Sequence, residues 1–488
     1  MANNKEKIHS IKYNFIMNFI LSASNFIFPL MTFPYISRVL HATGNGKINF
    51  AASVANYFLM VASLGIPVYG IKACAKVRDN KNALSKIAQE ILIINLVATT
   101  LATSTYVVCV FTIPRFSQDK VLFFIEGINI VLNMFGANWI YKALEKYDYI
   151  VIRSITFKFI SVILMFLLIH QESDYQVYAF ISVFAAVGSN ILNFVRLHRY
   201  ISFKKNGKYC FRQHIKPILI LFAQNITISI YTNLDTVMLG FMKGDTEVGL
   251  YSAVVKIKAI LLSVVSSLGS VMLPRMSYYI QNGAKEKFNN LMSKALNAAL
   301  FMGLPLCAYF VYESRDSILF LAGDDYLGAI ITMKIITFAI IPNALTEVIG
   351  VQVLTPLNKE KYVLYSVIVG AISNFTMNLF MIPYMGASGA ALATTIAEFL
   401  VLFVQLILGR NVVLAAVKAM RFARYISFTI IALIPTVLVR IIQIPNPFFA
   451  LVLTAITFFG TYTIELFLIK DELLLKALDN KITGRLIK

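Results

Sequence analysis

The feature that most constrains this fold is a series of apolar runs, each long enough to cross a lipid bilayer. A helix needs about 20 apolar residues to span roughly 30 Å of hydrocarbon. The chain of 488 residues contains fourteen such runs, separated by basic clusters, Gly or Pro, near 13–37, 48–70, 88–113, 120–141, 150–169, 176–197, 216–240, 249–273, 290–312, 328–354, 361–383, 387–409, 424–444 and 447–469. Backbone polar groups in lipid must be paired within the segment, so these runs predict helices. We therefore expect an all-α, polytopic membrane protein with about 14 transmembrane helices.

The distribution of Lys and Arg predicts the orientation of these helices. Of the 44 basic residues, 33 lie at the two termini and in the loops after even-numbered runs, whereas 7 lie in the loops after odd-numbered runs. The positive-inside rule places the richer set in the cytoplasm, with both termini on that side. The net charge of +20 is then a topology signal that also attracts anionic membrane lipids, and it requires no nucleic-acid partner.

Cysteine and histidine spacing argues against a metal site and a disulfide framework, and we expect no cofactor. Cys74, Cys109, Cys210 and Cys307 are at least 35 residues apart, and none lies in a cluster with His. Even the longest polar segments are too short to fold as a soluble catalytic domain. No nucleophile or acid–base pair lies in a sequence context that is typical of an active site. The sequence therefore predicts that the protein is not an enzyme.

Polar stripes mark one face of four of the expected helices, in the first, second, seventh and eighth runs. At 100° per residue each set shares a face: Asn14, Asn18, Asn25 and Thr32; Asn49, Ser53, Asn56 and Ser63; Asn225, Ser229, Thr232 and Thr236; and Ser252, Lys256, Ser263, Ser267 and Ser270. The stripes recur six helices apart, which favours two six-helix lobes around a central polar cavity, with two further C-terminal helices. The alternative is that small and amide residues only allow helices to pack closely.

This pattern divides the chain into four parts. We expect an N-lobe over 1–200, a cytoplasmic linker over 201–215, a C-lobe over 216–410 and a C-terminal part over 411–488.

Charged residues inside the apolar runs are the candidate functional groups, because a charge at membrane depth costs several kcal/mol unless it meets water or a partner. Lys256 is predicted to face the cavity, whereas Lys258 reaches the nearer membrane surface. Asp235 is the predicted partner of Lys256. Further charges in the runs are Lys334, Glu126 and Glu398. They form either an internal pairing network or a site for an anionic substrate and a coupling ion.

Several segments resemble the signatures of bacterial polysaccharide flippases of the Wzx type, in the MOP superfamily with the MATE exporters. They are Phe33–Leu40 with Gly44 and Gly46, Asn138–Arg153, Glu247–Ala253 and Ile382–Thr394. The resemblance covers the whole chain. Two positions depart from the family pattern: Asn138 stands where an acidic residue is frequent, and His41 where Gly is common.

The resemblance implies a protein of the bacterial cytoplasmic (inner) membrane that moves undecaprenyl-pyrophosphate-linked oligosaccharide units, as for O-antigen, lipopolysaccharide or capsule, by alternating access. Lys256 and Arg38 are candidate cations for the pyrophosphate. Candidate sugar contacts come from the stripes and Lys334, namely Asn14, Asn18, Asn25, Asn49, Asn56, Asn225 and Ser252. Asp235, Glu126 or Glu398 would bind a coupling ion, H⁺ or Na⁺. A glycan polymerase and a chain-length regulator are candidate partners.

Two rivals remain at this point. A MATE-like exporter of organic cations or drugs would need an acidic cavity rather than one that contains lysine. A membrane glycan polymerase would be an enzyme with sizeable outer loops, whereas the outer loops here are short.

Overall fold

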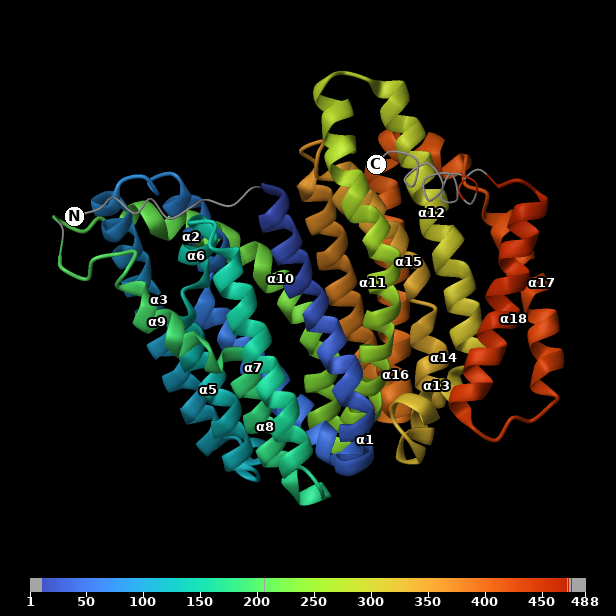
Figure 1. Cartoon of the computed structure of the whole chain (residues 1–488), viewed down its shortest axis with the longest axis horizontal. Helices are drawn as coiled ribbons and strands as arrows, with labels where there is room; N and C mark the ends of the chain where they lie inside the picture. The colour runs from blue at the N-terminus through green and yellow to red at the C-terminus, as the bar shows by residue number, and fades with distance from the viewer. Residues whose placement is uncertain (1–10, 206, 472, 474, 476–488) are drawn as a thin grey trace. The chain divides into compact units, whose positions relative to one another are not determined.

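The computed structural model describes residues 11–205, 207–471, 473 and 475. Within them the chain is helical, and it divides into two compact units, Met1–Gly249 and Leu250–Lys488. Figure 1 shows that the long helices of each unit run side by side. Among these described residues, eleven stretches are long and apolar enough to cross a membrane, as expected for a multi-pass membrane protein.

The first unit consists of long helices that overlap the predicted runs and of several short helices between them. They are α1 (Ile11–Ser63), α2 (Ile66–Ala75), α3 (Lys81–Thr112), α4 (Pro114–Ser117), α5 (Lys120–Gly136), α6 (Asn138–Ala143), α7 (Tyr147–Leu168), η1 (Glu172–Asp174), α8 (Tyr175–Val183), the π-helical η2 (Phe184–Gly188), α9 (Asn190–Leu197) and α10 (Arg212–Met242). The next helix, α11 (Asp245–Gln281), begins in this unit and continues into the second.

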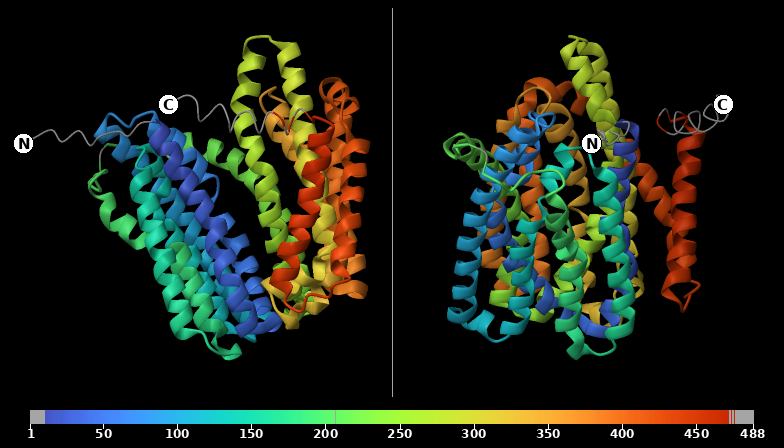
Figure 2. Two further views of the ribbon diagram at one scale, coloured as in Figure 1. Left: turned by 45° about the vertical axis from the view of Figure 1, so that its right-hand side comes forward. Right: turned by 60° about the vertical axis from the view of Figure 1, so that its left-hand side comes forward.

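The second unit contains the rest of α11 and the helices that follow. They are α12 (Lys285–Tyr312), α13 (Ser314–Leu321), η3 (Asp324–Ala329), α14 (Ile330–Thr337), α15 (Ile340–Thr346), the π-helical η4 (Glu347–Leu354), α16 (Glu360–Lys418), α17 (Phe422–Arg440) and α18 (Pro447–Leu468). The last two helices pack on each other as a hairpin, drawn in red in Figure 2.

Two very long helices each contain a break where two crossings were predicted. The apolar stretches Phe19–Ala75 and Glu360–Lys418 have 57 and 59 residues, far more than one crossing needs. The first is interrupted at His41 and the second at Gly386, both with non-helical backbone angles. With both stretches divided and α10 included, the described helices are consistent with the predicted fourteen crossings.

The break at His41 places a histidine in a backbone conformation that favours glycine. Its angles are φ 55° and ψ −177°, a region that is essentially reserved for Gly. Asn45, which is buried, donates from Nδ2 to the His41 carbonyl at 3.1 Å and so ties the break to the next turn. The equivalent break in α16 uses Gly386, with φ 54° and ψ −130°. His41 therefore carries backbone strain that Gly386 avoids.

We expect His41→Gly to raise the stability of the protein by about 1 kcal/mol, because the relief of strain outweighs the greater chain entropy of glycine. Unfolding temperatures of the purified protein in detergent would measure this change. Gly386→Ala is the matched control and should lower the unfolding temperature. A lower unfolding temperature for His41→Gly would show that the histidine side chain stabilises the protein by more than the backbone strain destabilises it.

The segment between α9 and α10 is held against α3 by buried polar groups. Glu90 is fully buried and accepts hydrogen bonds from the Cys210 backbone N–H at 2.8 Å and from Gln213 at 3.1 Å. His214 Nε2 lies 2.6 Å from the second Glu90 oxygen, and its Nδ1 lies 2.8 Å from the Tyr69 hydroxyl. The start of α10 is thereby attached to α2 and α3, so α10 belongs to the first compact unit. The predicted division into two six-helix lobes stays a prediction.

Candidate functional site

A pocket of about 440 Å³ with both apolar and polar walls lies in the first unit, between the part of α1 before His41, α7 and the α8–η2 segment. Its walls combine Phe28, Pro29 and Met165 with hydroxyl, amide and ammonium groups. The polar groups are Asn25, Thr32, Ser154, Lys158, Ser161, Tyr178 and Ser182. These elements are membrane-spanning by length and composition. Polar groups at that depth identify the pocket as a candidate binding site.

Among the described residues that line this pocket, Lys158 is the only charged one. Its Nζ donates to Ser24 Oγ at 2.8 Å and to Asn25 Oδ1 at 2.6 Å, and it lies 5.8 Å from the centre of the Phe28 ring. Within the described residues no carboxylate pairs with it. The ammonium is therefore held in place by neutral groups while its charge remains uncompensated, an arrangement that suits an anionic ligand.

Two predicted residues of the first stripe lie in this pocket. Asn25 contacts Lys158 directly, and Thr32 hydrogen-bonds to the Tyr178 hydroxyl. The side chains of Asn14 and Asn18 lie outside the described residues, as do those of Asn225, Ser229, Ser267 and Ser270. Lys158 lies inside an apolar run, but the stripes do not single it out as a site residue. The sequence feature that could have identified it is its spacing to Ser154 and Ser161, at i−4 and i+3, which puts the three residues on one polar face of α7.

The second predicted stripe and Arg38 are placed elsewhere in the first unit. Asn49 donates to the Asn45 carbonyl of its own helix at 2.6 Å, and Asn56 is exposed. Arg38 is exposed and donates to the Pro34 carbonyl at 2.6 Å. None of these three side chains lines the pocket around Lys158. Their role as substrate contacts stays a prediction.

The predicted residues of the second unit differ in burial. Ser252 is buried, Lys256 is half-buried and Lys334 is exposed. Asp235 belongs to the first unit and Lys256 to the second, so the pairing of these two residues also stays a prediction.

The three candidate ion-coupling carboxylates are all buried: Glu126 and Asp235 in the first unit and Glu398 in the second, at 4%, 5% and 7% exposure. Glu398 follows Thr394 by one helical turn. Thr394 hydrogen-bonds to the Tyr251 hydroxyl at 3.2 Å and accepts from Asn374 at 3.3 Å. Glu398 therefore lies next to a buried network of hydroxyl and amide groups that the stripes did not predict.

The segment Asn138–Arg153 forms a buried network at one end of the first unit. Arg153, which is 7% exposed, donates to Asn138 Oδ1 at 3.0 Å and to the Ser189 carbonyl at 3.1 Å. Asn193 also donates to Asn138 Oδ1, at 2.9 Å. Asn138 thus joins α6, α7 and α9 through its amide oxygen. Its position supports a structural role for this signature.

Trp139, in the same segment, lies at a close contact between α2 and α6. It is the single Trp of the chain and is 5% exposed. A Cβ added at Gly70 would lie 2.5 Å from the Trp139 ring, so α2 and α6 approach closely only because position 70 has no side chain.

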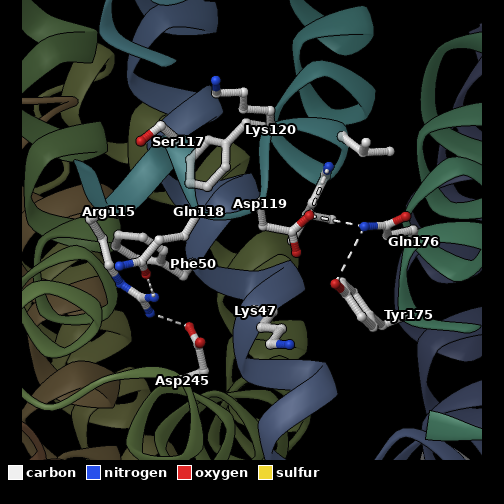
Figure 3. A pocket seen from close by; sticks show the side chains of 13 residues that line it. Lys47, Phe50, Arg115, Ser117, Gln118, Asp119, Lys120, Tyr175, Gln176 and Asp245 are labelled. Atoms are coloured by element: carbon white, nitrogen blue, oxygen red, sulfur yellow. Dashed lines mark hydrogen bonds and ion pairs between the residues drawn. The ribbon is translucent and has the colours of Figure 1, made fainter. Parts of the chain in front are cut away.

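A second pocket, of about 530 Å³, lies where the connections after the first, third, fifth and seventh runs meet (Figure 3). This is the predicted outer end of the first unit. Arg115 of α4 forms an ion pair with Asp245 at the start of α11 and donates to the Gly240 carbonyl at 3.1 Å. On the opposite wall Gln176 donates to Asp119 at 2.9 Å, and Lys47 lies over the Tyr175 ring.

The outer end is also closed by direct backbone packing. A Cβ added at Gly46 would lie 1.7 Å from the Asp245 carbonyl oxygen, and one at Gly249 would lie 1.9 Å from the Ala42 carbonyl oxygen. The Thr43 and Thr246 hydroxyl oxygens are 2.9 Å apart. The helix that follows His41 and the first turn of α11 are therefore in contact, reinforced by the Arg115–Asp245 pair.

Solved structures with the same fold are membrane transporters. The lipid II flippase MurJ in an inward closed conformation is 15% identical, with a TM-score of 0.75 over 94% of this chain and 99% of that chain. An inward-facing multidrug resistance MATE family transporter of the MOP superfamily is 12% identical, with a TM-score of 0.60 over 80% of this chain and 99% of that chain. These similarities establish the fold.

Sequence relatives have related names. A protein of Escherichia coli (strain K12) named as a candidate O-antigen transporter is 22% identical over 405 residues, which is 82% of this chain and 97% of the relative. The lipid II flippase MurJ of Bacillus subtilis (strain 168) is 24% identical over 145 residues, 29% of this chain and 26% of the relative. These two relatives are named as a transporter and a flippase, and neither is named as an enzyme.

Two family models match the chain. The MatE model matches residues 221–380, about a third of the chain. The model described as polysaccharide biosynthesis protein matches residues 11–280, which include the Lys158 pocket, the Asn138–Arg153 network and the closed outer end. Because this match covers more than half of the sequence, the chain belongs to the polysaccharide biosynthesis protein family.

Proposed function

We propose that this protein is a flippase that moves undecaprenyl-pyrophosphate-linked oligosaccharide units across the bacterial cytoplasmic membrane. The observation that carries the proposal is the pocket around Lys158. An ammonium without an opposite charge would bind the pyrophosphate, and the surrounding hydroxyl and amide groups would bind sugar hydroxyls. The family assignment and the names of the relatives support the same substrate class.

The charge of this pocket favours a lipid-linked glycan over an organic cation. A cationic drug would be repelled by Lys158, and none of the described residues that line the pocket is acidic. The MATE-like alternative is supported by the fold and by a partial family match, but not by the chemistry of this pocket.

Transport would alternate between inward-open and outward-open states. The contacts between Thr43 and Thr246 and between Arg115 and Asp245 would hold the outer end shut in one state and separate in the other. The Lys and Arg counts support a cytoplasmic location for both termini. Asp235, Glu126 and Glu398 are the groups that would bind a coupling H⁺ or Na⁺, and Lys256, Arg38 and the remaining stripe residues would line the path. A glycan polymerase and a chain-length regulator would receive the product.

A deletion strain tests this function. Loss of the flippase should leave single lipid-linked repeat units on the cytoplasmic face, where they are protected from a membrane-impermeant glycosidase added to spheroplasts. Re-expression should restore export without changing resistance to cationic drugs. Single units exposed on the outer face would indicate a polymerase instead, and a loss of drug resistance alone would favour the cation exporter.

A further inference from the structure

A groove of about 990 Å³ in the second unit is lined by residues that belong neither to the Lys158 pocket nor to the proposed transport path. It is formed by the end of α11, the start of α12, the turn before α16 and the last two turns of α16. These segments follow even-numbered runs, so the groove lies on the predicted cytoplasmic side. The turn that joins α11 to α12 is seen at the top of Figure 1.

Among the residues that the structure describes, three cations line this groove and no acidic residue does. They are Lys285, Arg410 and Lys418, and each is exposed. Within the described residues, none of the three forms an ion pair. The positive-inside rule explains why cations lie on this side, but not why three of them face one groove without a carboxylate. Other cations on the same side, such as Lys287 and Lys361, do not line it.

Apolar side chains form the rest of the walls. Phe288 is buried, Ile280 and Leu357 are half-buried, and Leu414 is 51% exposed. Along the end of α16, Arg410, Leu414 and Lys418 follow one another at intervals of four residues and so share one helical face. An apolar residue between two cations on one face at a membrane surface matches a molecule with an anionic head and a hydrocarbon tail.

We propose that this groove binds an anionic phospholipid of the cytoplasmic leaflet, with the phosphate between Lys285, Arg410 and Lys418 and an acyl chain against Phe288 and Leu414. Asn289 and Asn411, which also line the groove, supply amide groups for the glycerol and phosphate oxygens. The C-terminal segment 476–488 is not a suitable occupant, because it carries four basic residues and one acidic residue and would be repelled. The proposal does not depend on which substrate the protein transports.

Native mass spectrometry of the full-length protein in non-ionic detergent tests the site, with phosphatidylglycerol, phosphatidylcholine and undecaprenyl diphosphate as probes. We expect the wild type to bind phosphatidylglycerol in preference to phosphatidylcholine. In the triple variant Lys285→Gln, Arg410→Gln, Lys418→Gln this preference should fall roughly 100-fold at low salt. The reason is that each surface cation strengthens the binding of an anionic lipid about fivefold. High salt should weaken the preference in the wild type as well.

A second triple variant, Arg275→Gln, Lys287→Gln, Lys361→Gln, has the same charge change at exposed positions outside the groove and should retain the preference. The proposal is overturned if both triple variants lose the preference equally, or if the wild type binds the two phospholipids alike. It is also overturned if the groove variant loses only the binding of undecaprenyl diphosphate, because the groove would then be a site for the transport substrate. Unchanged unfolding temperatures would show that both variants remain folded.

Discussion

Oxidation of a Thr43→Cys, Thr246→Cys variant, made in a background with the four native cysteines replaced by Ala, is expected to stop glycan export. The two threonine hydroxyl oxygens are 2.9 Å apart, so sulfur atoms at these positions lie within reach of a disulfide with little backbone movement. The covalent link would hold the helix after His41 against the first turn of α11. If the outer end must open in each cycle, export should fall by more than about tenfold and recover on reduction.

A matched control is available in the second unit, where Thr332 of α14 and Ser388 of α16 also have hydroxyl oxygens 2.9 Å apart. Both helices fall within the predicted C-lobe, so Thr332→Cys, Ser388→Cys should crosslink without loss of export. Repeat-unit export in cells, with crosslinking scored by a mobility shift after thiol labelling, would measure both variants. Full export by a completely crosslinked Thr43→Cys, Thr246→Cys protein would contradict an opening at this end.

The membrane-spanning helices were predictable from the sequence because hydropathy acts locally. Several of their ends were not: α11, for example, continues to Gln281, beyond the predicted run 249–273. A span in lipid must satisfy its backbone groups within itself, so an apolar run of about 20 residues has few alternatives to a helix. The breaks at His41 and Gly386 fall between predicted runs, because the chain is less apolar where one run ends and the next begins. The spacing of basic residues likewise predicted that the odd-numbered connections share a side, and those of the first unit do meet around the pocket of Arg115 and Asp245.

The neighbours of the polar groups were not predictable in the same way. Helical periodicity shows which residues share a face, but not which helix that face meets. Periodicity groups Asn25 and Thr32 on one face of a helix, yet their partners Lys158 and Tyr178 lie more than 130 residues away in sequence. The attachment of α10 to α3 through Glu90 and His214 depends on a similar long-range contact.

The family signature also needed the structure for its interpretation. Sequence placed Asn138 and Arg153 in one motif, and the departure at Asn138 put its role in doubt. The amide oxygen of Asn138 accepts hydrogen bonds from both Arg153 and Asn193, so a neutral side chain suffices to hold three helices together.

Replacement of Lys158 by Met is expected to lower glycan export while leaving the protein folded. The variant removes the ammonium and keeps a long side chain of similar shape. Hydrogen bonds to charged groups contribute about 1.5–3 kcal/mol, so the substrate level for half-maximal export should rise roughly 10- to 100-fold. Transport of a lipid-linked pyrophosphate analogue into proteoliposomes would measure it. Lys158→Glu should have a larger effect, because a carboxylate repels the pyrophosphate, whereas Lys158→Arg should retain part of the activity.

Stability separates this functional role of Lys158 from a structural one. Because the ammonium contacts neutral groups, namely Ser24, Asn25 and the Phe28 ring, its removal leaves no buried opposite charge unpaired. The unfolding temperature of Lys158→Met should therefore stay the same or rise while export falls. Lys72→Met, at an exposed lysine of α2, serves as the control and should change neither quantity. A parallel loss of stability and export would assign Lys158 to packing, whereas normal export by a stable Lys158→Met protein would remove the pocket from the transport path.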